Sequence, residues 1–265
     1  MSIDFPDINP IILSVGPLAV SWYSLSYVIG IIIFYIYGKY LIKNLKLHYI
    51  NNLNLDRLIN WIIIGLIVGG RLGYVFFYDF MKYLENPIDI LKTYEGGMSF
   101  HGVLLGVALA VYIYCKKYRV KYFALTDLFA IIAPIGLFLI RIGNFINGEL
   151  YGRITNLPWA VLFPAGGYLP RHPSQIYEAL TEGLLLFFII RYAVSKKKFM
   201  QVGFLSGVFL LGYGCCRFLV EFTREPDSQI GFIISFFTIG QFLSIPMVLL
   251  GIFIIKNSLR EKYNN

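Results

Sequence analysis

Seven stretches of the chain are long enough and apolar enough to cross a membrane as helices. They lie at about 18–38, 58–78, 99–115, 124–141, 175–195, 202–222 and 238–255. A helix that crosses about 30 Å of hydrocarbon needs roughly 20 residues, and tilting accommodates somewhat different lengths. The pattern predicts an all-α polytopic membrane protein with seven transmembrane helices, forming a single integral-membrane domain over residues 1–265.

The charges of the chain predict the orientation of these helices in the membrane. The chain is 57% hydrophobic and 14% charged, whereas soluble domains carry about 25% charged residues. Its net charge of +8 could suggest nucleic acid, but 15 of the 23 Lys and Arg residues lie on one side of the predicted helices. By the positive-inside rule this side is cytoplasmic. We therefore expect the N-terminus outside, the C-terminus inside, contact with anionic membrane lipids, and no nucleic-acid partner.

Polar residues interrupt the apolar segments at one depth. Arg71 in "VGGRLGYVFF", Arg141 in "LFLIRIGN" and Arg217 in "CCRFLVE" lie far along segments that run from inside to outside. Tyr23 and His101 lie near the outer ends of segments that run the other way. A charge at mid-membrane costs roughly 2.5–3.5 kcal/mol on insertion scales. The shared depth therefore predicts a functional layer in the outer third of the membrane.

Each of these residues also has an ordinary interpretation when it is taken alone. Arg71 and Arg141 could be anchors that snorkel to the membrane surface. Tyr23 could belong to an interfacial aromatic belt, and His101 could be an interfacial residue at a helix start. Glu149 could be a solvated loop carboxylate. The combination of residues, more than any single one, indicates a site.

Arginines are spaced to share helix faces with partners. Arg217, Glu221 and Arg224 stand at i, i+4 and i+7, so the glutamate can offset the desolvation of Arg217 and fix its direction. Arg141 and Asn144 stand at i and i+3, and Asn147 follows at i+6 if the helix continues past residue 143. Guanidinium groups held in a fixed orientation can bind phosphate through two hydrogen bonds each. The abundant phosphate at this depth belongs to a phospholipid.

Several motifs resemble a known family across nearly the whole chain. They are "WYSLSY", "GGRLGYVFFY", "GGMSFHG", "RIGNFINGELYG", "LPRHPSQIYEAL", "GYGCCRFLVEFTREPD" and "TIGQFLSIPM". In this order they resemble the bacterial prolipoprotein diacylglyceryl transferase family. The sequence departs from the family pattern at Ser24, where the family usually has glycine, and at the cysteine pair of "GYGCCRF". We interpret both departures as packing variation.

The resemblance implies a multi-pass enzyme of the bacterial inner membrane. Such an enzyme transfers the diacylglyceryl group of phosphatidylglycerol to the lipobox cysteine thiol of a preprolipoprotein. It forms a thioether and releases glycerol phosphate, as the first step of lipoprotein maturation. The functional positions that the resemblance implies are Tyr23, His101, Arg141, Asn144, Glu149, Gly152, Tyr213, Arg217 and Glu221.

Roles follow from the chemistry that these residue types allow. We expect Arg141 and Arg217 to bind the phosphate, with Glu221 orienting Arg217, and Asn144 and Tyr23 to hydrogen-bond the headgroup. Arg71, Asn147, Gly152 and Tyr213 complete the predicted substrate-binding set.

The identity of the base stays open at this point. The acceptor thiol, with an ordinary pKa of about 8.5, must lose its proton before it attacks carbon. His101 is the leading candidate, and Glu149 could instead take the proton or orient an arginine. Only three histidines are present and no ligand cluster surrounds them, so no metal or other cofactor is expected.

The loops at about 79–98 and 142–174 are predicted to form small extracytoplasmic caps that admit the substrate peptide. The second loop contains "LPWAVLFP", a β-prone run bounded by prolines, and ends where Pro173 suits a helix start. Cys115, Cys215 and Cys216 are expected to pack, and no cleaved signal peptide is expected.

Two other functions use the same arginines. A lipid or solute transporter could bind phosphate with them, although such proteins often show inverted repeats. A phospholipase would share the phosphate site but would need an activated water or a Ser/His nucleophile.

Overall fold

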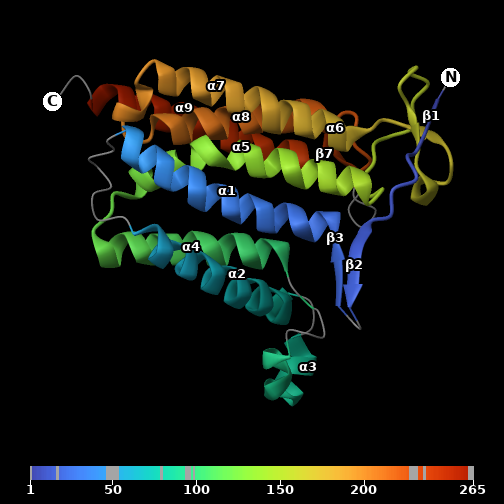
Figure 1. Cartoon of the computed structure of the whole chain (residues 1–265), viewed down its shortest axis with the longest axis horizontal. Coiled ribbons are helices and arrows are strands. Elements are labelled where there is room, and N and C mark those ends of the chain that lie inside the picture. The colour runs from blue at the N-terminus through green and yellow to red at the C-terminus, as the bar shows by residue number, and fades with distance from the viewer. Residues whose placement is uncertain are drawn as a thin grey trace. The chain divides into compact units, whose positions relative to one another are not determined.

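The computed structural model describes residues 2–15, 18–45, 54–77, 80–92, 97, 99–226, 232–234 and 237–261. The described α-helices (Figure 1) are α1 (Trp22–Leu45), α2 (Leu55–Phe77), α3 (Phe80–Glu85), α4 (Phe100–Tyr118), α5 (Tyr122–Ile146), α6 (Ser174–Glu178), α7 (Leu186–Ser195), α8 (Phe204–Val220) and α9 (Ile239–Glu261). Shorter helical pieces are η2 (Pro87–Leu91), η4 (Pro164–Gly166), η6 (Lys198–Met200) and the π-helix η5 (Ala179–Leu185). The described strands are β1 (Ile3–Asp4), β2 (Ile11–Val15), β3 (Leu18–Ser21), β4 (Val161–Leu162), β5 (Pro170–Arg171), β6 (Phe232–Ile234) and β7 (Phe237–Thr238).

Each of the seven predicted segments contains a helix in the structure, with shifted ends. The first helix begins at Trp22 and not at residue 18, because residues 18–21 form β3, which pairs antiparallel with β2. Among the described helices, four are long and apolar enough to cross a membrane: Trp22–Leu45, Leu55–Phe76, Tyr122–Ile146 and Ile239–Arg260. Helix α8 is a shorter apolar helix. The chain is thus mostly helical, as expected for a polytopic membrane protein.

The chain divides into two compact units. The first comprises Met1–Tyr40 and Thr126–Asn265, and the second comprises Leu41–Leu125. The single domain over residues 1–265 stays a prediction.

In the second unit, α2 and α4 pack through glycines. Gly65, Gly69 and Gly73 stand four residues apart on α2, opposite Gly102 and Gly106 of α4. A Cβ atom on Gly69 would lie 2.4 Å from the carbonyl oxygen of Gly102 and 2.6 Å from the Cα atom of Gly106. Small residues at this spacing let two membrane helices approach backbone to backbone. A larger residue in this seam must push the helices apart.

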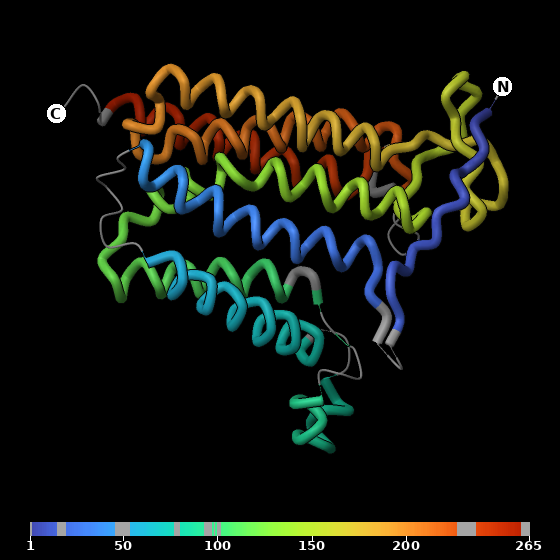
Figure 2. The backbone as a smooth tube through the Cα atoms, viewed as in Figure 1, coloured from blue at the N-terminus to red at the C-terminus, as the bar shows by residue number. Residues whose placement is uncertain are grey.

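In the first unit, α6, η5 and α7 follow one another without a break from Ser174 to Ser195 (Figure 2). This rod packs against α5 where a Cβ atom on Gly183 would lie 2.7 Å from the Cβ atom of Phe138. Helices α8 and α9 are similarly close, since a Cβ atom on Gly251 would lie 2.8 Å from the carbonyl oxygen of Gly207. These close approaches fix the helices that carry the candidate site.

The start of α8 is capped by a carboxylate from another helix. Asp127 of α5, which is 6% exposed, accepts hydrogen bonds from the backbone N–H groups of Gly203 (2.6 Å) and Ser206 (2.7 Å) and from the Ser206 hydroxyl (2.6 Å). The first N–H groups of a helix have no partner within the helix, and an anion there is favourable. Asp127 therefore fixes α8 against α5.

The predicted cap at 142–174 contains a small sheet. β1 pairs parallel with β4, and β4 pairs antiparallel with β5. The β-prone run in "LPWAVLFP" is confirmed as β4. Next to it the fully buried Phe163 packs against Phe5, Phe145 and Tyr151, with ring centroids 5.3–6.0 Å apart.

Candidate active site

A buried cluster of arginines and glutamates lies where α5, the α6–η5 segment and α8 meet. This arginine–glutamate cluster consists of Arg141, Glu178, Glu182, Arg217, Glu221 and Arg224. Three of its side chains are cationic and three are anionic, so with all groups ionised the cluster is neutral.

Glu178 joins all three arginines. Its Oε2 lies 3.2 Å from Nε of Arg141, and its Oε1 is shared by Nη1 of Arg217 and Nη1 of Arg224, the latter at 2.9 Å. The Glu178 side chain is 0% exposed. A carboxylate removed from water in this way is tolerated only with close cationic partners. Glu178 thus holds the three guanidiniums in fixed directions.

Glu182 completes the cluster with looser contacts. Its Oε2 lies 3.4 Å from Nη2 of Arg141 and its Oε1 lies 3.8 Å from Nη1 of Arg217, although its side chain is also 0% exposed. It stands within η5, the π-helix that begins directly after Glu178. Short π segments inside α-helices are rare and occur frequently at functional sites.

Glu221 orients Arg217 as the i, i+4 spacing predicts. Its Oε2 lies 2.9 Å from Nη2 of Arg217, and its Oε1 accepts a 2.9 Å hydrogen bond from the Thr238 hydroxyl. A Cβ atom on Gly240 would lie 2.7 Å from the Glu221 carboxyl carbon. The carboxylate therefore sits at the N-terminus of α9, where the helix dipole favours it. This contact explains why a residue without a side chain, Gly240, stands in the sequence "TIGQ".

Two further predicted residues adjoin the cluster. Tyr213 lies one turn before Arg217 on α8 and interacts electrostatically with Glu182 and Arg141. Tyr23 hydrogen-bonds Tyr27, with 2.7 Å between the hydroxyl oxygens.

α1 approaches α5 beside the cluster. Gly143 permits this approach, because its Cβ atom would lie 3.1 Å from the Cα atom of Tyr23. Tyr27 in turn interacts electrostatically with Arg141 and Glu149.

The loop after α5 is organised around Glu149. Helix α5 persists past Gly143 to Ile146, and the Nδ2 group of the buried Asn144 donates to Oε1 of Glu149 at 2.8 Å. Asn147 donates to the same oxygen at 3.4 Å, and Gln175 donates to the backbone carbonyl of Glu149 at 2.6 Å. Glu149 is therefore held by amides at the end of the helix that carries Arg141.

Gly152 is a point of close backbone contact. Its N–H donates to the carbonyl of His172 at 2.8 Å, and a Cβ atom would lie 2.4 Å from the carbonyl oxygen of Thr223. The next residue, Arg153, donates from Nε to the carbonyl of Arg224 at 2.8 Å. Gly152 thus links the loop to the end of α8, and its predicted role in substrate binding stays a prediction.

His172 lies in the same loop. Its Nδ1 is 3.2 Å from the Tyr177 hydroxyl, which also accepts a 2.7 Å hydrogen bond from the Trp159 indole N–H. Burial lowers the pKa of His172, and the nearby Arg153 lowers it further. Both effects favour the neutral form of His172.

Arg71 and His101 belong to the second unit. Arg71 is 5% exposed and donates to the backbone carbonyls of Ile90 (2.8 Å), Gly97 (3.2 Å), Asp89 (2.5 Å) and Lys92 (3.2 Å). The structure thus shows Arg71 holding the backbone at residues 89–92 and at Gly97, while its phosphate-binding role stays a prediction.

His101 lies in the first turn of α4. Ser99 is the N-cap of this helix, because its side chain accepts a hydrogen bond from the N–H of Gly102 at 3.3 Å. The His101 side chain lies outside the described residues.

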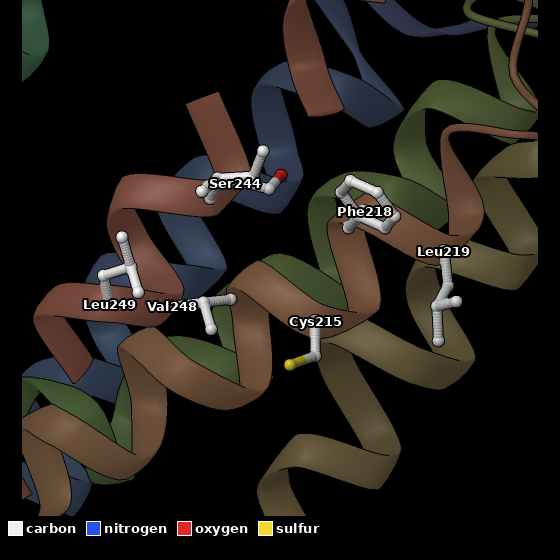
Figure 3. A pocket seen from close by; sticks show the side chains of 7 residues that line it. Cys215, Phe218, Leu219, Ser244, Val248 and Leu249 are labelled. Carbon is white, nitrogen blue, oxygen red and sulfur yellow. The ribbon is translucent and has the colours of Figure 1, made fainter. Parts of the chain in front are cut away.

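An apolar groove of about 340 Å³ lies between α8 and α9 (Figure 3). It is lined by Cys215, Phe218, Leu219, Ser244, Ile245, Val248 and Leu249. None of these side chains carries a charge, so the groove offers no grip on a phosphate.

The cluster contains two residues that the sequence interpretation missed. Neither Glu178 nor Glu182 is among the site residues predicted from the sequence. A signal was present, because both are carboxylates inside a predicted span, and intramembrane ionisable residues mark function by default. Within the described parts of the chain, no group of three or more His, Cys, Asp or Glu side chains is placed to hold a metal ion.

Comparisons with known proteins identify the family of the chain. The family model described as "Prolipoprotein diacylglyceryl transferase" matches residues 10–256. The phosphatidylglycerol–prolipoprotein diacylglyceryl transferase of Rickettsia felis is 56% identical over 255 residues, which cover 96% of this chain and 98% of the relative. Its counterpart in Rickettsia conorii is 54% identical over the same shares of both chains. That of Rickettsia bellii is 55% identical over 252 residues, 95% of each chain. The chain belongs to the prolipoprotein diacylglyceryl transferase family.

Proposed function

We propose that the chain transfers the diacylglyceryl group of phosphatidylglycerol to the lipobox cysteine thiol of preprolipoproteins, forming a thioether and releasing glycerol phosphate. Full-length similarity to transferases of that name supports the reaction. The observation that carries the site is the arginine–glutamate cluster, in which one buried carboxylate aims three guanidiniums.

The cluster suits the charge that develops during transfer. The acceptor sulfur, as a thiolate, attacks the glyceryl carbon that bears the phosphate oxygen. The carbon–oxygen bond breaks, its electron pair stays on the phosphate, and the sulfur–carbon bond forms. Negative charge therefore grows on the phosphate, where Arg141 and Arg217 stabilise the transition state more than the ground state. Their anchoring by Glu178 and Glu221 means that little reorganisation is needed.

The headgroup glycerol fits the polar residues at the end of α5. Asn144 and Asn147 are held around Glu149, and each has a buried Oδ1 atom without a hydrogen-bond partner among the described residues. Hydroxyl groups of a glycerol would supply the missing donors. Tyr23, Gly152 and Tyr213 complete the proposed substrate contacts, as the sequence predicts.

The base is His101 or Glu149, and a pH–rate comparison of His101→Gln with Glu149→Gln separates them. General base catalysis contributes about 10²–10⁴-fold. The variant that loses the base should fall on that scale and recover as pH approaches the thiol's pKa of about 8.5.

The proposed setting is the bacterial inner membrane. The seven apolar segments support seven spans, and the distribution of Lys and Arg supports an outer N-terminus and an inner C-terminus. This orientation would open the site toward the outer leaflet. The substrate partners are then phosphatidylglycerol from the bilayer and the lipobox peptide of a preprolipoprotein.

The test is a transfer assay with purified protein. Phosphatidylglycerol vesicles and a synthetic lipobox peptide should give a peptide whose mass rises by one diacylglyceryl group. A peptide with serine in place of the lipobox cysteine is the matched control and should stay unmodified. Release of glycerol phosphate without any peptide modification would indicate a phospholipase instead.

A further inference from the structure

With all six groups ionised, the arginine–glutamate cluster is neutral before any lipid binds. Arg141, Arg217 and Arg224 are balanced by Glu178, Glu182 and Glu221. A phosphodiester carries one negative charge. If all six groups stayed ionised, the bound lipid would leave an excess negative charge in a site removed from water, which is costly.

Among the three carboxylates, Glu182 is held least tightly. Glu178 has arginine nitrogens at 3.2 and 2.9 Å, and Glu221 has one at 2.9 Å together with the Thr238 hydroxyl. Among the described residues, Glu182 has arginine contacts only at 3.4 and 3.8 Å. Protonating Glu182 therefore weakens the longest ion pairs of the cluster.

Among the described residues, no group around Glu182 is better able to take up a proton. The groups that face it are Arg141 from α5, Glu178 from α6, and Tyr213, Cys216 and Arg217 from α8. The arginines stay charged at all relevant pH values. Glu178 is fixed by three of them, and Tyr213 and Cys216 are neutral when protonated and can take up no further proton.

We propose that Glu182 takes up one proton when the lipid phosphodiester binds between Arg141 and Arg217. This inference rests on the proposed function, because it assigns phosphatidylglycerol to that site. The protonated carboxyl group releases Nη2 of Arg141 for the phosphate and itself donates a hydrogen bond to a phosphate oxygen, where an ionised carboxylate would repel the anion. Lipid binding is thereby coupled to proton uptake.

Calorimetry counts the protons directly. The probe is dihexanoyl phosphatidylglycerol, whose phosphodiester does not titrate near neutral pH, and each titration is made in two buffers of different ionisation enthalpy. The wild-type protein should take up about one proton per lipid, and its affinity should fall by up to about tenfold per pH unit over the range where uptake occurs. Glu182→Gln should bind without proton uptake and with an affinity that does not change with pH.

Glu85→Gln is the matched control, because Glu85 is an exposed carboxylate of α3 outside the cluster. It should keep the proton uptake of the wild type. Binding without uptake by the wild type, or undiminished uptake by Glu182→Gln, would overturn the proposal.

Infrared difference spectra of the wild type give a readout that needs no variant. Adding the lipid should remove a carboxylate band and create a protonated-carboxyl band, and an unchanged carboxyl region would count against Glu182. The transfer assay on the same preparation distinguishes a failure of this inference from a failure of the proposed function. Transfer without proton uptake rejects this inference alone, whereas absence of transfer rejects the proposed function.

Discussion

Replacing Glu178 by glutamine should disable the enzyme with little change in side-chain volume. The carboxylate presents Oε1 to Arg217 and Arg224 and Oε2 to Arg141. An amide has only one oxygen. Whichever way it turns, its NH₂ group faces at least one guanidinium, donor against donor.

The size of the loss follows from the burial of this ion pair. Removing one partner of a buried salt bridge costs about 3–5 kcal/mol. If the cost falls on the orientation of the arginines in the transition state, kcat drops by about 10²- to 5 × 10³-fold. The KM for phosphatidylglycerol should change much less, because the remaining arginines still attract the anion.

The assay is transfer to a lipobox peptide at varied lipid concentration, with the thermal unfolding temperature as a check on folding. Glu225→Gln is the matched control, since Glu225 forms a 3.0 Å pair with Arg171 and its side chain is 46% exposed. Surface pairs are worth about 0–1 kcal/mol, so this variant should lose less than about fivefold. A folded Glu178→Gln variant with kcat within fivefold of wild type would refute the positioning role of Glu178.

Three further predictions concern the scaffold. Gly69→Ala should lower the free energy of unfolding by about 1–3 kcal/mol through overpacking. Gly136→Ala should leave this free energy nearly unchanged, because its Cβ atom would meet nothing within 4 Å. Thermal unfolding of both variants in one detergent tests this, and equal effects would contradict the close approach of α2 and α4. Asp127→Ala should cost about 1.5–3 kcal/mol in the same measurement, because the N–H groups at the start of α8 lose a charged acceptor, and an unchanged unfolding temperature would contradict the capping role. Because the pKa of His172 is lowered in the folded loop, the unfolded loop binds more protons below about pH 6.5, so loop stability should fall as pH drops through that region. Hydrogen exchange of the Gly152 amide measures this loss, which His172→Gln should abolish; equal pH dependence in both proteins would exclude His172 as its source.

The helices were predictable because their signal is local. A run of about 20 apolar residues suffices to indicate a span, and each predicted segment contains a helix. The ends were less certain. Residues 18–21 are as apolar as the helix that follows, and only their pairing with β2 places them in a strand.

The site was predictable in part, for a different reason. Arg217 and Glu221 stand on one helix, so their spacing predicted the ion pair that the structure shows. The link from Glu178 to Arg141 and Arg217 joins three segments that are distant in sequence, and no periodicity indicates which carboxylate meets which arginine. The buried partner of the arginines therefore emerged only from the fold.

The most direct test of the central claim is an electron cryo-microscopy map of the protein in nanodiscs that contain phosphatidylglycerol. The account predicts a lipid phosphate within hydrogen-bonding distance of both Arg141 and Arg217, with Glu178 still joining the two arginines. A map of transfer-competent protein in which the headgroup lies elsewhere, and the arginines contact only carboxylates, would contradict it.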